Sequence, residues 1–213
     1  MTDSLAASLV ETYKALARHG LNHGSSGNVS ARVGAEMLVT PTGATAESLT
    51  PAQMVRMPIL GPAAAGSAPS SEWPMHAAVY AACPEAGCVI HSHADACTAL
   101  ACLGEPLPAF HYMVVGFGGA TVPIARYAAF GTPALAEAAG HAIIGHKACL
   151  LENHGMIVQG PDAATALATA LRLETLARQF LLARGAGTPR ILSAEEVAAA
   201  KERYKTYGKP VPR

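Results

Sequence analysis

Two histidines stand one residue apart in CVIHSHADACTA, residues 88–99. The stretch begins like a buried strand, and side chains alternate between the faces of a strand, so His91 and His93 should project to the same side. An isolated His-X-His pair also fits two ordinary core imidazoles. A third histidine, His154, favours a metal site because it ends another apolar run, in LLENHG, and is followed by a glycine. Three imidazoles from neighbouring strands would leave an open position for water or substrate, as in a catalytic zinc site.

Glu72, in PSSEWPMH, is the fourth candidate residue. It would either complete the metal site or act as a base beside the ion. The alternative is an ordinary first-turn glutamate favoured by the helix dipole, because Ser70 or Ser71 can cap a helix that has Pro74 in its first turn. His76 lies four residues later on the same helix face, but no second motif supports it as a ligand.

Three short loops indicate an anion site. Residues 26–28 (SGN), 40–43 (TPTG) and 69–72 (PSSE) combine glycine or proline with small polar residues. The last of them opens a helix, whose free N–H groups favour a phosphate. No P-loop and no GxGxxG pattern precedes a helix, so the loops predict a small phosphate ester and not a nucleotide.

The elements that would position these residues are intermixed helices and strands. Periodicity and turn residues predict helices over 4–19, 71–82, 95–104, 132–143, 162–185 and 193–208, and strands at the end of 22–33, over 35–39 and 87–94, and as a pair within 147–160. An exposed loop is expected over 60–70. Because strands and helices do not alternate strictly, the pattern predicts a layered α/β fold with a mixed or largely antiparallel sheet.

Composition narrows the class further. The chain has 213 residues, 51% of them hydrophobic, which suits one domain spanning 1–213. Acidic and basic residues balance at 15 each, without a long basic run, so no nucleic-acid partner is expected. No signal peptide or membrane span is predicted. The five cysteines are odd in number and contain no CxxC, which indicates reduced thiols in a cytoplasmic protein and no cysteine nucleophile.

The chain resembles the class II aldolase/adducin family along nearly its whole length, from about residue 5 to YKTYG near the C-terminus. The motifs that carry the resemblance, in order, are SGNVSAR, TPTGA, PSSEWPMH, VIHSHADACTA, PAFHYMVVGFGG, YAAFGT and LLENHG. The resemblance implies a three-layer α/β/α subunit with a central, mostly antiparallel mixed sheet. It also implies a homotetramer with active sites between subunits.

The resemblance assigns roles to particular residues. It implies Zn²⁺, or another divalent cation such as Mn²⁺ or Co²⁺, bound by His91, His93 and His154, with Glu72 as an additional ligand in the resting state. Tyr112 would reach the site of the adjacent subunit, and Tyr207 would lie near the substrate. The residues implied for the substrate phosphate are Gly27, Asn28, Thr42, Gly43, Ser70 and Ser71.

The implied reaction is cleavage of a ketose 1-phosphate to dihydroxyacetone phosphate and an aldehyde through a metal-stabilised enediolate. No Schiff-base lysine is then needed. Glu72 would handle the proton at the enediolate carbon, and Tyr112 the proton at the aldehyde oxygen. The alternatives are a zinc dehydratase or epimerase of the same family, acting on a pentulose phosphate, and a non-catalytic adducin-like module. The intact histidines argue against the module.

The motifs do not specify the aldehyde portion of the substrate. Val114, Val115 and Phe117 follow Tyr112 and predict an apolar lining, which discriminates against hydroxyl groups only modestly. The expected substrates are therefore L-fuculose 1-phosphate, 5-deoxyribulose 1-phosphate or 5-methylthioribulose 1-phosphate, the last two in a salvage role.

Overall fold

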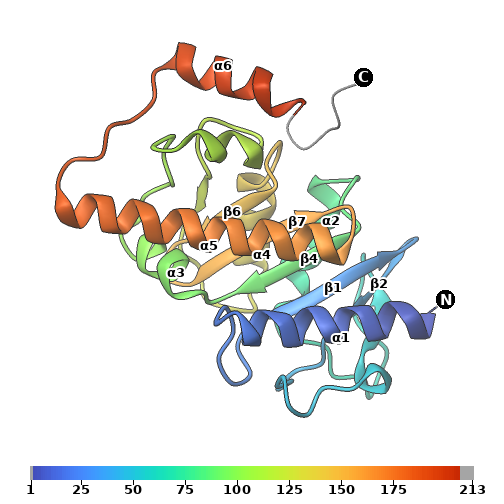
Figure 1. Cartoon of the computed structure of the whole chain (residues 1–213). Helices are drawn as coiled ribbons and strands as arrows, with labels where there is room; N and C mark the ends of the chain where they lie inside the picture. Colours follow the sequence, from blue (N-terminus) through green and yellow to red (C-terminus); the bar gives the residue numbers. More distant parts are fainter. Residues whose placement is uncertain (1, 207–213) are drawn as a thin grey trace, which may run out of the picture.

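A computed structural model describes residues 2–206 (Figure 1). The helices are α1 (Thr2–Arg18), α2 (Trp73–Ala82), α3 (Asp95–Ala101), α4 (Pro133–Ala142), α5 (Ala163–Ala186) and α6 (Ala194–Tyr204), with 3₁₀ helices η1 (Pro51–Gln53) and η2 (Tyr112–Phe117). The strands are β1 (Asn28–Val33), β2 (Glu36–Val39), β3 (Val55–Pro58), β4 (Cys88–Ser92), β5 (Ile124–Ala125), β6 (Ala148–Leu151) and β7 (Gly155–Gly160).

The strands form one sheet in the order β3-β2-β1-β4-β7-β6-β5. Every neighbouring pair is antiparallel except β5 and β6, which are parallel. The expected mixed, mostly antiparallel sheet is therefore confirmed. β4 lies at its centre, where Asn28 of β1 and Ile157 of β7 both pair with His91.

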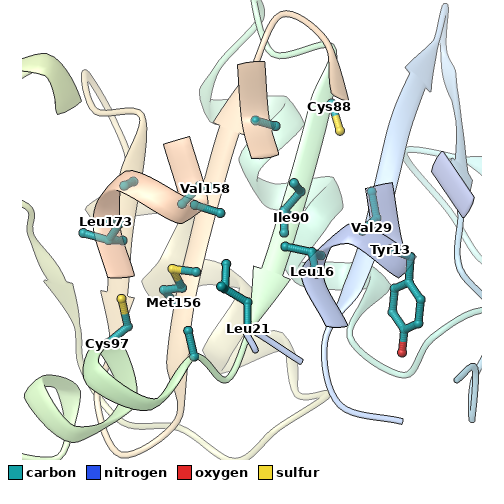
Figure 2. Close-up of a cluster of buried hydrophobic side chains, with 14 of the residues drawn as sticks. Tyr13, Leu16, Leu21, Val29, Cys88, Ile90, Cys97, Met156, Val158 and Leu173 are labelled. Carbon is teal, nitrogen blue, oxygen red and sulfur yellow. The ribbon is translucent and has the colours of Figure 1, made fainter. Parts of the chain in front are cut away.

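Helices cover both faces of the sheet and complete the expected α/β/α arrangement. On one face, α1, α3 and α5 enclose a core that includes Leu16, Ile90 and Leu173 (Figure 2). On the other face, α2 and α4 pack over a second core that includes Val79 and Val89. Neighbouring residues of β4 alternate between these cores, so His91 shares the face of Val89 and meets the α2 side of the sheet.

The start of α2 differs from the prediction. Glu72, and not Ser70 or Ser71, is the N-cap residue, and its side chain makes no capping hydrogen bond. Ser70 follows a short bridge between the two loops, in which its N–H donates to the Thr40 carbonyl at 2.9 Å, and its own carbonyl accepts from the Trp73 N–H in the turn before the helix. Helical structure therefore begins only at Trp73, which leaves the Glu72 carboxylate free to turn away from its own helix.

The start of α3 is held by a buried carboxylate from α5. Glu174 accepts hydrogen bonds from the N–H groups of Ala96 at 3.0 Å and Cys97 at 2.9 Å. These are two of the N–H groups that a helix leaves unpaired at its N-terminus. Because α3 begins two residues after His93, this contact also fixes the end of the His-X-His segment.

Replacing Glu174 with alanine should lower the free energy of unfolding by about 2 kcal/mol, because two buried N–H groups lose their acceptor. Urea unfolding would measure the change. The matched control is Thr175→Ala, at the next position of α5, which is exposed and should change stability by less than about 0.5 kcal/mol. Equal effects of the two substitutions would contradict this role of Glu174.

Candidate metal centre and active site

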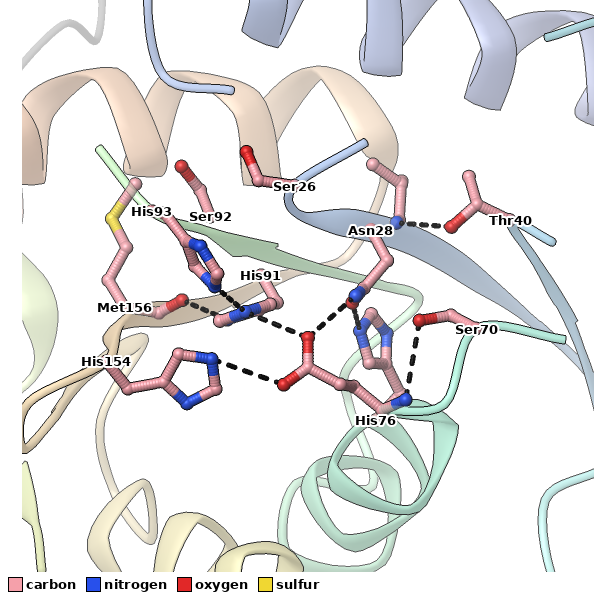
Figure 3. A network of polar contacts seen from close by, with 12 residues as sticks. Ser26, Asn28, Thr40, Ser70, His76, His91, Ser92, His93, His154 and Met156 are labelled. Carbon is pink, nitrogen blue, oxygen red and sulfur yellow. Dashed lines mark hydrogen bonds and ion pairs between the residues drawn. The ribbon is translucent and has the colours of Figure 1, made fainter. Parts of the chain in front are cut away.

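Glu72, His91, His93 and His154 come together at one point (Figure 3). One nitrogen or oxygen from each side chain lies within 4.8 Å of the corresponding atoms of the others. The Nε2 atoms of His91 and His93 are 3.0 Å apart, and the two carboxylate oxygens of Glu72 lie 3.1 Å from His91 Nε2 and 3.2 Å from His154 Nε2. The structure thus brings together all four residues that the sequence predicted as ligands.

His91 is oriented by the neighbouring strand. Its Nδ1 lies 2.9 Å from the Met156 carbonyl oxygen of β7, and a carbonyl can only accept a hydrogen bond. Nδ1 therefore donates to this carbonyl, and Nε2 faces the cluster. Such a carbonyl contact is a common way of fixing a metal-binding histidine.

His154 reaches the cluster from the turn between β6 and β7. Its N–H donates to the Leu151 carbonyl at 3.0 Å, and Asn153 adopts φ 53°, a left-handed conformation that asparagine tolerates better than most residues. Gly155 follows at a point of close approach, where a Cβ atom would overlap the Ser92 carbonyl oxygen and lie 3.2 Å from the His93 ring. The NHG sequence therefore combines a turn, a candidate ligand and a contact that only glycine allows.

Glu72 is held as an anion by its surroundings. Burial raises its pKa, but the charge interaction with His91 and hydrogen bonds to His154 and His91 outweigh burial and hold the pKa well below its usual range. Asn28 Nδ2 also donates to Glu72 Oε2 at 3.1 Å. The other carboxylate oxygen, Oε1, is buried and, apart from His154 Nε2 at 3.2 Å, has no polar partner within the described residues.

The donor set fits a divalent cation. Burial, followed by His91 and His154, lowers the pKa of His93 to about 4, so this imidazole is neutral at pH 7 and offers a lone pair. Lone pairs and a carboxylate converging on one point repel each other unless protons or a cation lie between them. Three imidazoles with one carboxylate suit zinc and the neighbouring transition metals, and Glu72 Oε1, whose one partner among the described residues is the candidate ligand His154, offers an oxygen to the ion.

A pocket of about 270 Å³ opens beside the cluster. It is lined by Ser71, Glu72, His93, Tyr127, Ala128, Phe130, Asn153 and His154. Tyr127 and Phe130 are largely exposed here, at 63% and 73%. The local sequence pattern predicts no role for either residue, although the motif YAAFGT contains both.

The residues expected to bind phosphate lie on three adjoining segments. The bridge between the second and third loops joins Thr40 to Ser70, and the Thr42 N–H donates to the Ala68 carbonyl at 2.9 Å. Thr42 and Gly43 line a separate hollow of about 260 Å³, whereas Ser71 lines the pocket of the metal centre. Gly27 packs on Asn22 and the Asn28 amide contacts Glu72 and His76, so the phosphate assignment of the six residues stays a prediction.

Tyr112 stands apart from the metal centre of its own chain. It is 47% exposed and borders a hollow formed with α6, not the pocket of the cluster. Val114 and Phe117 are fully buried in the core and Val115 is buried beneath α6, so the expected apolar lining by these three residues is wrong for this pocket. The short 3₁₀ helix η2 turns them inward. Tyr207 lies outside the described residues.

The described cysteines are free thiols, as expected. Cys102 is exposed and the other four are buried. Burial raises the pKa of Cys88 and of Cys149 to about 12, which disfavours the thiolate that a nucleophile needs. Across residues 2–206, no helix has both the length and the apolar character needed to cross a membrane.

Fold and site agree with the comparisons to known proteins. The family described as Class II Aldolase and Adducin N-terminal domain matches residues 7–181, and the chain belongs to this family. It is 42% identical over 205 residues to a 5-methylthioribulose-1-phosphate/5-deoxyribulose-1-phosphate aldolase of Rhodospirillum rubrum, a match that covers 96% of this chain and 93% of the relative. It is 41% identical to the L-fuculose phosphate aldolase of Escherichia coli K12, with 97% and 96% covered.

A solved structure of an L-fuculose 1-phosphate aldolase superposes with a TM-score of 0.89 at 35% identity and covers 95% of this chain and 96% of its own. The solved structure of an L-fuculose-1-phosphate aldolase from Thermus thermophilus superposes with a TM-score of 0.76 at 27% identity. This match covers 86% of this chain and 97% of that chain. The activity that these relatives indicate is that of a class II aldolase, a metal-dependent lyase.

The metal-free protein should bind one Co²⁺ per chain at the Glu72 cluster. His91→Ala or His154→Ala should weaken binding by more than about 100-fold, because losing even an outer partner of a ligand costs 10- to 100-fold. Titration followed by the visible absorption of Co²⁺ would measure this. The control is His141→Ala, an exposed imidazole on α4, which should bind like the parent. Similar losses in all three variants would contradict the assignment.

Proposed function

We propose that this chain cleaves a ketose 1-phosphate to dihydroxyacetone phosphate and an aldehyde with Zn²⁺ held by Glu72, His91, His93 and His154. The observation that carries the proposal is the convergence of three imidazole nitrogens and a carboxylate beside an open pocket. When bound, the ion would supply Lewis-acid stabilisation for the negative charge of an enediolate.

Two side chains would move protons. In the cleavage direction, the C3–C4 bond breaks, its electron pair forms the enediolate at C2 and C3, and C3 then takes up a proton. Glu72 is assigned to that transfer because its carboxylate lines the pocket: as the anion it would remove the C3 proton in the condensation direction, and in cleavage it would take up a proton from solvent and pass it to C3. Tyr112, supplied by a neighbouring subunit, is assigned to the proton at the C4 oxygen, which becomes the aldehyde oxygen.

The phosphate would be held by Gly27, Asn28, Thr42, Gly43, Ser70 and Ser71. In support, the Asn28 amide contacts Glu72, Ser71 and Glu72 border the same pocket, and the segment of Thr42 and Gly43 is joined to Ser70 by a short bridge. Backbone N–H groups and small hydroxyl groups suit a phosphate. Tyr207 remains a proposed contact of the substrate.

The aldehyde portion would be small and poor in hydroxyl groups. Tyr127 and Phe130 present aromatic surface at the pocket mouth, and relatives are named for both fuculose phosphate and for methylthio- and deoxyribulose phosphate. We therefore propose 5-deoxyribulose 1-phosphate and 5-methylthioribulose 1-phosphate as substrates alongside L-fuculose 1-phosphate. A hydroxyl group added against such a surface costs about 1–3 kcal/mol.

The reaction would take place in the cytoplasm, as part of sugar phosphate metabolism or of the salvage of 5′-deoxynucleosides. The free thiols support this location, because disulfides are rare in a reducing compartment.

The zinc-loaded protein should release dihydroxyacetone phosphate from these three ketulose 1-phosphates. Glu72→Gln should lower kcat by about 100-fold or more, because a positioned acid or base contributes that much. A coupled assay of dihydroxyacetone phosphate would measure both. The control substrate is ribulose 5-phosphate, whose epimerisation or dehydration without cleavage would contradict the aldolase and favour the alternative reactions.

The active form would be a homotetramer with each site between two subunits. The exposed position of Tyr112, away from the cluster of its own chain, supports this arrangement, since a second chain can then supply it.

Mixing two inactive variants tests the shared site. After subunit exchange, an equal mixture of Glu72→Gln and Tyr112→Phe should recover activity in about a quarter of the sites, because chance pairs intact Glu72 with intact Tyr112 at that frequency in a cyclic oligomer. Activity of the mixture is compared with that of each variant alone. Recovery would be absent if every chain used its own Tyr112.

A further inference from the structure

Behind the metal centre runs a chain of buried polar side chains. It starts at Glu72, passes through Asn28, His76 and Ser30, and ends at Tyr80, all of which are buried. Buried polar groups are costly unless they are hydrogen-bonded, so a chain of this length invites a functional explanation. Its members belong to β1 and to α2 with the N-cap residue Glu72, and Asn28 and His76 lie at the end of the network opposite His154 (Figure 3).

The carboxylate fixes the direction of the first two hydrogen bonds. Glu72 Oε2 can only accept, so the group facing it at 3.1 Å is the Asn28 amide nitrogen. The amide oxygen then points to the other side, where it can again only accept. His76 Nε2 lies there at 2.5 Å and must donate.

The hydrogen bonds on the far side of His76 run in the same donor-to-acceptor direction. Burial, followed by His91, lowers the pKa of His76 to about 3, so the ring is neutral and its Nδ1 accepts. The Ser30 hydroxyl donates to Nδ1 at 2.7 Å and accepts from the Tyr80 hydroxyl at 2.8 Å. All of these hydrogen bonds therefore point toward Glu72. Arg32 lies over the Tyr80 ring at 4.8 Å and anchors the far end.

We propose that His76 is a positioning residue, which holds the Asn28 amide in the orientation that directs the Glu72 carboxylate to the metal centre. Asn28 is fixed by its backbone pairing with His91, but its amide group could turn over. The turned amide would place its oxygen next to Glu72 Oε2. Both oxygens can only accept a hydrogen bond, so this orientation is unfavourable. The N–H of His76 opposes this by holding the amide oxygen on its own side.

The inference rests on the proposed metal centre and extends it to a residue that is not a ligand. His76 has no contact with the pocket, and it acts only through Asn28. Asn28 keeps a second amide hydrogen, which remains available to a substrate phosphate. One amide would thereby join the carboxylate of the metal centre to the phosphate site.

Two conservative substitutions distinguish the role of His76 Nε2 from that of His76 Nδ1. The amide nitrogen of His76→Gln can reach the place of Nε2 and donate to Asn28, whereas the shorter His76→Asn ends near Nδ1 and cannot. We expect His76→Asn to weaken Co²⁺ binding by about 10- to 100-fold and His76→Gln to restore most of it, as for outer partners of metal ligands. Titration with Co²⁺ alone, followed by its visible absorption, measures both.

Asn28→Ala tests whether His76 acts through Asn28. It should weaken Co²⁺ binding by a similar factor, and adding His76→Asn to it should cause little further loss, because the two residues form one path. Thermal unfolding is recorded for each protein, since a merely structural role of His76 would lower stability without rescue by glutamine. If His76→Asn does not fold, Co²⁺ binding by Asn28→Ala alone decides whether the Asn28 amide supports the metal centre.

Three results would overturn the inference: equal Co²⁺ binding by His76→Asn and His76→Gln, additive losses in the double variant, or parent-like binding by Asn28→Ala. Substrate assays give an independent readout. With the ketulose 1-phosphates, His76→Asn should lower kcat while KM changes little, because Glu72 acts in the chemical step. The expected Co²⁺ pattern without any cleavage would refute the proposed function and leave the role of His76 standing.

Discussion

The antiparallel pairing of β4 with both of its neighbours is the constraint on which the site depends. It sets Asn28 opposite His91 on one side and the Met156 carbonyl within 2.9 Å of the same ring on the other. Two hydrogen-bonded strand pairings thus orient the His91 imidazole without a bound metal ion. α2 covers the face of β4 that carries His91. Glu72, at the start of α2, therefore lies on the same side of the sheet as this imidazole.

The sequence predicted much of this site for a physical reason. Strand alternation placed His91 on one face and Ser92 on the other, where the Ser92 hydroxyl now donates to the Leu21 carbonyl at 2.6 Å. The turn residues around His154 indicated the turn that joins two short strands. Local rules of this kind do not reveal which segments meet, so the convergence of Glu72 with the histidines needed the motif resemblance or the structure.

Other features could not be found from local pattern. Ser70 looked like a helix cap, but its N–H pairs with Thr40, thirty positions earlier in the chain, and the helix starts later. Val114 and Phe117 looked like a pocket lining, but η2 turns them into the core. His76 had no motif of its own, because its partners Asn28 and Ser30 are distant in sequence and adjacent only in space.

The turn that carries His154 has a consequence for how the protein is made. The four candidate ligands extend from Glu72 to His154, so a nascent chain that has emerged only through α4 holds three of them and lacks the fourth. The centre is complete only when β6 and β7 have added to the sheet, a long-range step of the slow kind. An ion that needs all four residues would stabilise the finished fold over every shorter intermediate.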